Sequence, residues 1–360
     1  MKDVVIIGGG LAGLSAAYYL QKENNSVQIL EANDYIGGRI KTVSTLTGAA
    51  LELGATWIFY DSVLKTLLKE LKINLYEQYT KGDAIYESVI ELKPQRFNAH
   101  QMTGGQRYHK VVGGTSKIID ALAQVIGSKN IKINTVVTRV IDKGDYIEVQ
   151  TNKGELIKAK KIIVAIPPKL LQSSIIFDPL LTDKSNEIRK NTHTWMGEST
   201  KFSVEYKSPF WREKNMAGLA LSMAGLVREV QDHVNGDNTA YALVGFLNLK
   251  QEHYHMSKKE RKSIVIKDLV RLFGQEAQDV IAYEDLIWNI QAFTSPYFNL
   301  NENLSAHQNN GNKELIKPQM NNKLFFAGAE TSNENSGYME GAVISAQIVA
   351  QNVSQKILSK

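Results

Sequence analysis

The 360-residue chain contains no cysteine. This absence excludes disulfides, thiolate metal sites, thiol nucleophiles and any prosthetic group linked through cysteine. The chain also lacks an apolar run close to the roughly 18 residues that a membrane-spanning helix needs. Its first apolar stretch begins almost at residue 1, without the basic segment and cleavage site of a secretory signal. From these absences we expect a cytoplasmic protein with no membrane partner.

The chain also has little excess charge of either sign and few histidines. The formal net charge is +5, and the lysines and arginines are scattered along the chain. Solvated helix and strand faces explain them better than a nucleic-acid surface does, so we expect no nucleic-acid partner. The seven histidines are dispersed, and His253 and His255 are expected to be an exposed pair. No metal site is predicted.

The first informative motif lies at the N-terminus. An apolar stretch over residues 3–7 precedes Gly8, Gly10 and Gly13 in the spacing G-x-G-x-x-G, with Ala12 at the start of a small-residue helix. Gly8 permits a tight turn, Gly10 lets backbone amides approach a pyrophosphate, and Gly13 lets the helix pack on the strand. The amino end of that helix favours phosphate. A chance turn is the alternative, but the flanking strand and helix favour a dinucleotide site.

A second strand over residues 26–31 ends in Glu31, 18 residues after Gly13. A carboxylate at this point can accept hydrogen bonds from ribose hydroxyl groups. A glycine pair ending at Gly38 and then Arg39 follow, and a guanidinium there can neutralise phosphate with directed donors. Taken alone, this segment could be an ordinary loop with a solvated arginine. The joint pattern predicts that Glu31, Gly38 and Arg39 contact the cofactor.

Further segments carry a resemblance to a known family. They are residues 112–120, 132–136 and 162–168, and above all 324–342, which reads LFFAGAETSNENSGYMEGA. Together with the N-terminal motif they resemble the flavin-containing monoamine oxidase family over nearly the whole chain. The resemblance implies FAD as the cofactor, bound non-covalently here because no cysteine can link it. It also implies that Val136 meets the adenine and Glu330 the ribityl chain.

The resemblance implies further residues around the flavin ring. Gly54, Ala55 and Thr56 match a loop of small residues beside the ring. Gly328 lies in the C-terminal cofactor segment. Trp288, at the start of the segment that supplies the second cage wall, is expected to contact the cofactor. Met339 lies at the start of the last helix, whose amino end can stabilise negative charge on the reduced ring.

Three residues are expected to take part in catalysis. Lys201 matches the family's lysine that holds a water near flavin N5, where a buried cation would assist reoxidation by oxygen. Without the resemblance, a strand lysine is expected to extend to solvent. Tyr338 matches one wall of an aromatic cage that orients a neutral amine. Phe293 is the nearest match for the opposite wall and Tyr297 is its rival, because the family's usual tyrosine is absent there.

One departure from the family lies between Tyr86 and Gly105. Relatives have a long helical insertion that covers the substrate cavity, whereas this chain has only residues 87–104. The chain is therefore a shortened member with a more open site. A bulky substrate, a lid from another subunit and a changed activity are all compatible with this loss. The oligomeric state stays open, with a homodimer as one alternative.

The expected fold class is α/β with an α+β second domain. A length of 360 residues agrees with two packed domains. We expect a Rossmann-like FAD-binding domain assembled from discontinuous segments, and a sheet-based substrate domain inserted into it. The first comprises residues 1–75, 108–175 and 315–360, and the second residues 76–107 and 176–314.

Local patterns support a sheet in the second domain. Apolar and polar residues alternate over 201–206 and 239–248, which predicts strands with one buried face. A helix is predicted from about residue 257 to 273, because Ser257 and Glu260 have the spacing of a capping box.

The predicted function is that of an FAD-dependent amine oxidase. Hydride passes from the α carbon of an amine to flavin N5, the imine hydrolyses, and molecular oxygen reoxidises the flavin to give hydrogen peroxide. The cofactor carries the redox chemistry, so few protein acids or bases are needed. Two alternatives remain: a flavin desaturase or dehydrogenase acting on a carbon–carbon bond, and a flavin-binding protein without turnover.

Overall fold

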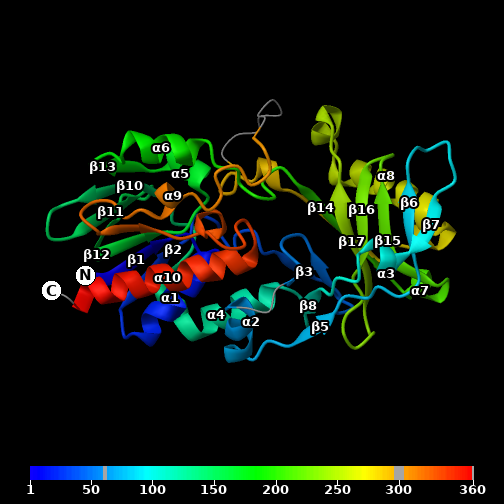
Figure 1. Ribbon diagram of the computed structural model, residues 1–360, viewed down its shortest axis with the longest axis horizontal. Coiled ribbons are helices and arrows are strands. Elements are labelled where there is room, and N and C mark those ends of the chain that lie inside the picture. Colours follow the sequence, from blue (N-terminus) through cyan, green and yellow to red (C-terminus); the bar gives the residue numbers. More distant parts are fainter. Residues whose placement is uncertain (60–62, 296–303, 359–360) are drawn as a thin grey trace.

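Two large β-sheets organise the protein, whose computed structural model describes residues 1–59, 63–295 and 304–358. They lie toward opposite ends of its long axis (Figure 1). The first sheet contains β1 (Lys2–Ile7), β2 (Val27–Leu30), β9 (Ile131–Lys132), β10 (Val137–Asp142), β11 (Ile147–Thr151), β12 (Leu156–Val164), β13 (Ile176–Asp178) and β19 (Leu324–Phe326). Its order is β13-β10-β11-β12-β1-β2-β9, and β19 also pairs with β12.

The core of the first sheet is parallel. Strands β9, β2, β1, β12 and β19 run in one direction, and residues 4–7 of β1 are buried, as expected when both faces are covered. Strand β12 changes partner along its length. Its first residues pair antiparallel with β11, and residues 162–164 pair with β19 from the far end of the sequence. Both ends of the chain therefore share one parallel sheet, which confirms the expected α/β class.

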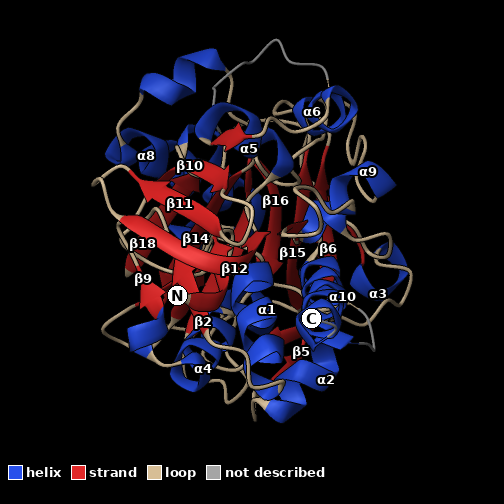
Figure 2. Ribbon diagram, turned by 90° about the vertical axis from the view of Figure 1, so that its left-hand side faces the viewer, coloured by secondary structure: helices blue, strands red, loops and turns tan. Residues whose placement is uncertain are grey.

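Helices cover both faces of this sheet. One face packs against α1 (Leu11–Lys22), α4 (Ser116–Ile126) and α10 (Met339–Leu358), with α2 (Val63–Glu70) beside α10. Both views show α10 alongside α1 (Figures 1 and 2). The opposite face packs against α5 (Pro168–Ser174), next to α6 (Asp183–Lys190) and α9 (Lys313–Ile316). Among the helices described, none is long and apolar enough to cross a membrane.

The second sheet contains β6 (Asp83–Glu87), β7 (Gln95–Asn98), β14 (Thr200–Tyr206), β15 (Met216–Ser222), β16 (Val227–Asp232), β17 (Tyr241–Leu247) and β18 (Ala282–Ile287). Its order is β18-β14-β17-β16-β15-β6-β7. One face packs on α8 (Lys258–Phe273), where Phe202, Val204 and Leu243 share a core with Val265 and Leu269. The short helices α7 (Phe210–Glu213) and α3 (Ala99–Met102) contact β15 and β7.

The two predicted strands and the predicted helix are confirmed, but the expectation of a single buried face is wrong for β14, whose residues are buried on both faces because one packs on α8 and the other faces the first domain. The segments 201–206 and 239–248 correspond to β14 and β17, which are neighbours in the sheet. Helix α8 begins directly after Ser257, whose hydroxyl accepts a hydrogen bond from the Glu260 N–H at 3.3 Å. The Glu260 carboxylate in turn accepts one from the Ser257 N–H at 2.7 Å. The capping box therefore satisfies free donors at the amino end of the helix.

Short strand pairs connect the two sheets: β3 (Thr42–Ser44) with β4 (Ala50–Glu52), and β5 (Leu75–Glu77) with β8 (His109–Val111). Where the resemblance implies a long helical insertion in relatives, residues 87–104 form only the β6–β7 turn, strand β7 and α3. Strand β13 joins the first sheet three residues beyond the expected boundary at 175. We keep the two-domain division as a proposal with that adjustment.

Candidate functional site

A cavity of about 430 Å³ lies between the carboxyl ends of β1 and β2 and the face of the second sheet that points away from α8. Every predicted site residue except Gly13 lines it. These residues are Gly8, Gly10, Ala12, Glu31, Gly38, Arg39, Gly54, Ala55, Thr56, Val136, Lys201, Trp288, Phe293, Gly328, Glu330, Tyr338 and Met339. Tyr297, the rival for the second cage wall, lies outside the described residues. The individual roles of the predicted residues that line the cavity remain proposals.

The glycines of the N-terminal motif hold the strand and helix close together. Gly8 has a φ of +109°, and a Cβ there would lie 2.6 Å from the carbonyl oxygen of Ala165. A Cβ on Gly13 would lie 2.0 Å from the carbonyl oxygen of Gly8, so Gly13 serves the packing of α1 and does not face the cavity. Gly10 differs, because its nearest neighbour would be Gly38 Cα at 3.8 Å. The backbone at Gly10 is therefore open to a ligand.

Glu31 fixes the glycine loop as well as facing the cavity. One carboxylate oxygen accepts a hydrogen bond from the Gly9 N–H at 2.6 Å. The other accepts from the backbone N–H and the side-chain amide of Asn33, at 2.8 and 2.9 Å. These bonds compensate the burial of the carboxylate and set its orientation at the end of β2.

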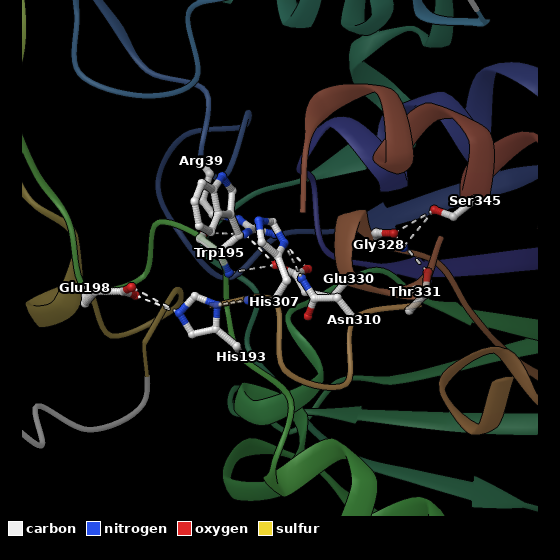
Figure 3. Close-up of polar contacts among 10 residues, drawn as sticks. All are labelled: Arg39, His193, Trp195, Glu198, His307, Asn310, Gly328, Glu330, Thr331 and Ser345. Atoms are coloured by element: carbon white, nitrogen blue, oxygen red, sulfur yellow. Dashed lines mark hydrogen bonds and ion pairs between the residues drawn. The ribbon is translucent and has the colours of Figure 1, made fainter. Parts of the chain in front are cut away.

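Arg39 has a partner within the chain. Its guanidinium binds both oxygens of Glu330, at 2.6 and 2.9 Å, and donates to the Trp195 carbonyl at 2.7 Å (Figure 3). The Trp195 N–H also donates to Glu330, at 3.2 Å. Glu330 is fully buried, and a buried carboxylate needs such a counter-charge. The cation that the sequence places near phosphate therefore also neutralises the acid expected at the ribityl chain.

The C-terminal segment is held at the cavity by hydroxyl groups. The Gly328 N–H donates to the Ser345 hydroxyl at 3.0 Å, and that hydroxyl donates to the Gly328 carbonyl at 2.9 Å. Thr331 donates to the same carbonyl at 2.9 Å (Figure 3). This network fixes Gly328 beside α10, at the side of the cavity where Glu330 lies.

Lys201 is buried inside the site and does not extend to solvent. Its amino group donates to the Gly54 carbonyl at 2.5 Å and to the Thr56 hydroxyl. It lies 4.8 Å from the centre of the Trp57 ring and 5.6 Å from that of Phe246. These contacts hold the cation against the loop that the resemblance places beside the flavin ring.

The charge of Lys201 is balanced within the protein. Burial lowers the pKa of its amino group to about 8, and the negative charges of Glu52 and Glu229 oppose that lowering. Glu52 is itself buried, and burial raises its pKa while Lys201 acts in the opposite direction. The Thr115 N–H, at 2.5 Å, and the Thr42 hydroxyl, at 3.0 Å, donate to the Glu52 carboxylate.

Aromatic rings surround Tyr338. Its ring centre lies 5.7 Å from that of Trp195, 5.5 Å from that of His307 and 6.3 Å from that of Phe59. Trp195 and His307 stack on one another at 4.2 Å. Phe293 lines the same cavity but is 37% exposed. Tyr338 therefore lies among rings from several distant segments, whereas Phe293 is at the margin.

A series of polar contacts lies next to this aromatic cluster. The backbone N–H of His307 donates to Nδ1 of His193 at 3.1 Å, and Nε2 of His193 lies 3.0 Å from the Glu198 carboxylate (Figure 3). The His307 ring also lies within hydrogen-bonding distance of the Asn310 amide, at 3.2 Å. Burial lowers the pKa of the His307 ring, and the nearby His193 adds to this effect. Burial and His193 therefore both disfavour protonation of the His307 ring.

Several cavity residues escaped sequence reasoning. Trp195 stands six residues before Lys201, and its aromatic side chain was an available signal. Phe246 lies on the predicted strand 239–248, on the face opposite the α8 core. No sequence pattern indicated that Glu229 faces the cavity, because no strand was predicted over the residues of β16. His307, which stacks on Trp195 but does not itself line the cavity, likewise stands in a segment without periodicity.

The model of the flavin containing amine oxidoreductase family matches residues 11–93 and 92–354. The chain belongs to this family and is an FAD-dependent oxidoreductase, which confirms the resemblance stated above. The probable flavin-containing monoamine oxidase A of Dictyostelium discoideum is 24% identical over 465 aligned positions, covering 99% of this chain and 98% of that protein. The putrescine oxidase of Kocuria rosea is 23% identical, and the match covers 81% of this chain and 83% of that protein.

Solved structures share the fold. Cyclohexylamine oxidase from Brevibacterium oxydans matches with a TM-score of 0.85 at 20% identity, over 99% of both chains. Wild-type putrescine oxidase bound to putrescine matches with a TM-score of 0.83 at 22% identity, over 100% of this chain and 99% of that one. These likenesses confirm the expected architecture of a Rossmann-like FAD-binding domain with a sheet-based second domain.

The cavity residues fit FAD. A Cβ at Gly10 or Gly328 would have no neighbour closer than 3.8 Å, so at both glycines the missing side chain leaves room for a ligand. The amino end of α1 follows Gly10 and supplies partial positive charge for a pyrophosphate. Glu31 lies at the end of β2, where a ribose is bound in dinucleotide folds. The cavity then continues to Lys201, which leaves space for the flavin ring.

Proposed function

We propose that the chain oxidises amines in the part of the cavity bounded by Lys201, Tyr338 and Trp195. Bound FAD supplies the acceptor for hydride from the α carbon of the amine, and molecular oxygen finally takes up the electrons as hydrogen peroxide while the imine hydrolyses. The observation that carries this proposal is a buried lysine facing the same cavity as a cluster of aromatic rings. Membership of the family supports the reaction class.

The aromatic residues bind and orient the amine. Tyr338 and Trp195 present apolar ring surfaces, which exclude water and restrict the positions open to the α carbon. The positive charge of Lys201 disfavours a second cation beside it. The reacting nitrogen therefore binds as the neutral amine, with its lone pair free to support loss of hydride.

Lys201 supports the step in which oxygen is reduced. A cation held by Gly54 and Thr56 is already oriented before negative charge develops on oxygen, so little reorganisation is needed. Because burial lowers its pKa only to about 8, the amino group carries its charge at neutral pH. Glu52 and Glu229 help to retain that charge.

The test begins with an absorbance spectrum of the purified protein. Anaerobic mixing with a panel of primary amines, secondary amines, polyamines and amino acids follows, and then oxygen is readmitted and hydrogen peroxide is measured. We expect at least one amine to bleach the visible band of the oxidised flavin, and oxygen to restore it with release of peroxide. A flavin that stays oxidised with every amine would contradict the proposal and favour a desaturase or a protein without turnover.

A further inference from the structure

His307 contacts two aromatic rings of the cavity without lining the cavity itself. Its ring centre lies 4.2 Å from that of Trp195, with 22° between the two planes, and 5.5 Å from that of Tyr338, with 28° between the planes. Trp195 and Tyr338 both line the cavity, whereas His307 does not. His307 therefore packs against the rings of the substrate end from outside the cavity lining.

Three segments that are distant in the sequence converge at these rings. Trp195 stands before β14, His307 lies in the segment 304–312, and Tyr338 directly precedes α10. Gly337 makes this approach possible, because a Cβ there would lie 2.9 Å from the His307 ring and 3.0 Å from the Trp195 side chain. Any larger residue at position 337 would push the rings apart.

The protein holds His307 in place through its own contacts. The φ of His307 is +60°, in the left-handed region that few residues other than glycine occupy, and such conformations persist only where the surroundings impose them. The backbone N–H of His307 donates to Nδ1 of His193 at 3.1 Å, and the His193 N–H donates to the Gln308 carbonyl at 3.0 Å. The Asn310 amide lies 3.2 Å from the His307 ring (Figure 3). Both the backbone and the ring of His307 are therefore fixed.

The backbone of Trp195 is held separately from its ring. Arg39 donates to the Trp195 carbonyl, and the Trp195 N–H donates to Glu330, so the ion pair at the cofactor end fixes this backbone. Because these are backbone contacts, they leave the rotation of the indole side chain open. The indole ring lies closer to His307, at 4.2 Å, than to Tyr338, at 5.7 Å. Stacking on a fixed ring therefore sets the plane of the indole.

We propose that His307 is a positioning residue of the amine site, which holds the rings of Trp195 and Tyr338 in the relative orientation that the substrate meets. This inference rests on the proposed amine oxidation and adds a residue outside the cavity that controls substrate binding. Without the His307 ring, the indole can turn and the apolar walls lose their fixed geometry. Since contact with these walls stabilises the substrate before and after hydride loss alike, its weakening raises KM more than it lowers kcat.

The kinetic test removes the ring and then restores one. His307→Asn deletes the ring with a residue that tolerates the left-handed backbone, and His307→Phe keeps an aromatic ring. With the best amine, we expect KM to rise about 5-fold in His307→Asn with kcat changed less than about 2-fold, and KM in His307→Phe to stay within about 2-fold of the parent.

Gln308→Ala is the matched control in the same segment. It removes the bond from the Gln308 side-chain amide to the Asn191 carbonyl, at 3.2 Å, and leaves the His307 ring in place. Both kinetic constants should be unchanged in this variant. An equal rise of KM in His307→Asn and Gln308→Ala would show that docking of the segment matters and the ring does not, which would overturn the proposal.

Near-ultraviolet circular dichroism of the flavin-loaded proteins measures the orientation of Trp195 without turnover. In each background, the difference produced by Trp195→Phe gives the Trp195 signal. We expect this signal to persist in His307→Phe and Gln308→Ala and to be lost in His307→Asn. An unchanged Trp195 signal in His307→Asn would overturn the proposal, whatever its KM. If no amine reduces the flavin of the parent protein, the proposed function fails, and the dichroism still decides whether His307 positions Trp195.

Discussion

The two ends of the cavity are built in different ways. At the cofactor end, the shape comes from backbone, and Gly8, Gly10 and Gly13 act through the side chains they lack. At the substrate end, it comes from side chains such as Lys201 and Glu229, which three neighbouring strands bring to one face. The first end depends on a few consecutive residues. The second depends on strand register, because a slip of one residue would turn its side chains to the opposite face.

The largest effect is expected at the cofactor end, from Gly13→Ala. The added Cβ would lie 2.0 Å from the Gly8 carbonyl oxygen, so α1 must move away from β1. We expect a loss of about 3 kcal/mol or more in the free energy of unfolding, together with loss of bound flavin. Denaturant unfolding and the ratio of flavin to protein absorbance measure the two effects.

Gly48→Ala is a control for this change. Unlike Gly13, Gly48 has a positive φ, of +91°, but a Cβ there would meet nothing within 4 Å. Only backbone strain of about 1 to 2 kcal/mol is expected, with flavin retained. Full flavin occupancy in Gly13→Ala would show that the close packing of helix and strand is not required for cofactor binding.

The same difference explains which parts of the fold and of the site could be predicted from the sequence. The glycine loop, Glu31 and the capped helix α8 follow from residues close together in the chain, and the structure places them as expected. Lys201 and Tyr338 could be located only because their segments resemble a known family. Glu229 could not be found, because its position depends on pairing between β16 and β17. Long-range register is not encoded by local periodicity.

Arg39 illustrates a second limit. Its position after two glycines predicted a phosphate contact, but the pattern contained no information about Glu330, almost three hundred residues away. The structure pairs the two groups because a fully buried carboxylate must be neutralised. A charged residue in a motif can thus have a structural partner in addition to the expected ligand, and only the fold shows which.

The next largest effect is expected at the substrate end, from Lys201→Met. Removing the cation should slow reoxidation of the reduced flavin by oxygen about 100-fold to 1000-fold, because preorganised charge beside the developing anion is lost. Reduction by the amine should change much less. Stopped-flow measurement of the two half-reactions separates these effects.

Lys110→Met is the matched control for Lys201→Met. Lys110 is equally buried, and burial lowers its pKa to about 8 as well. However, its amino group donates to the Asp232 carbonyl at 2.9 Å and does not line the cavity. An equal loss of oxygen reactivity in both variants would mean that the effect reflects stability and not the charge of Lys201.

A smaller effect is expected in the pH dependence of reoxidation. Because burial lowers the pKa of Lys201 to about 8, its charge is present below that pH and is lost as the pH rises through it. The rate of reoxidation should therefore fall across this range. In Glu52→Gln one of the two opposing negative charges is gone and Glu229 remains, so the midpoint should move to lower pH. A midpoint that stays in place would contradict the charge coupling between Glu52 and Lys201.

The smallest effect is expected from substitutions that distinguish Tyr338 and Phe293, the two residues predicted as walls of the aromatic cage. Tyr338 lies among the rings of Trp195, His307 and Phe59, whereas Phe293 is 37% exposed at the margin of the cavity. Tyr338→Ala should therefore raise KM for the best amine about 10-fold, and Phe293→Ala about 2-fold or less. Steady-state kinetics at a fixed oxygen concentration measure both values. Equal effects would place Phe293 in the cage beside Tyr338, and the substrate end would then be more enclosed than the exposure of Phe293 indicates.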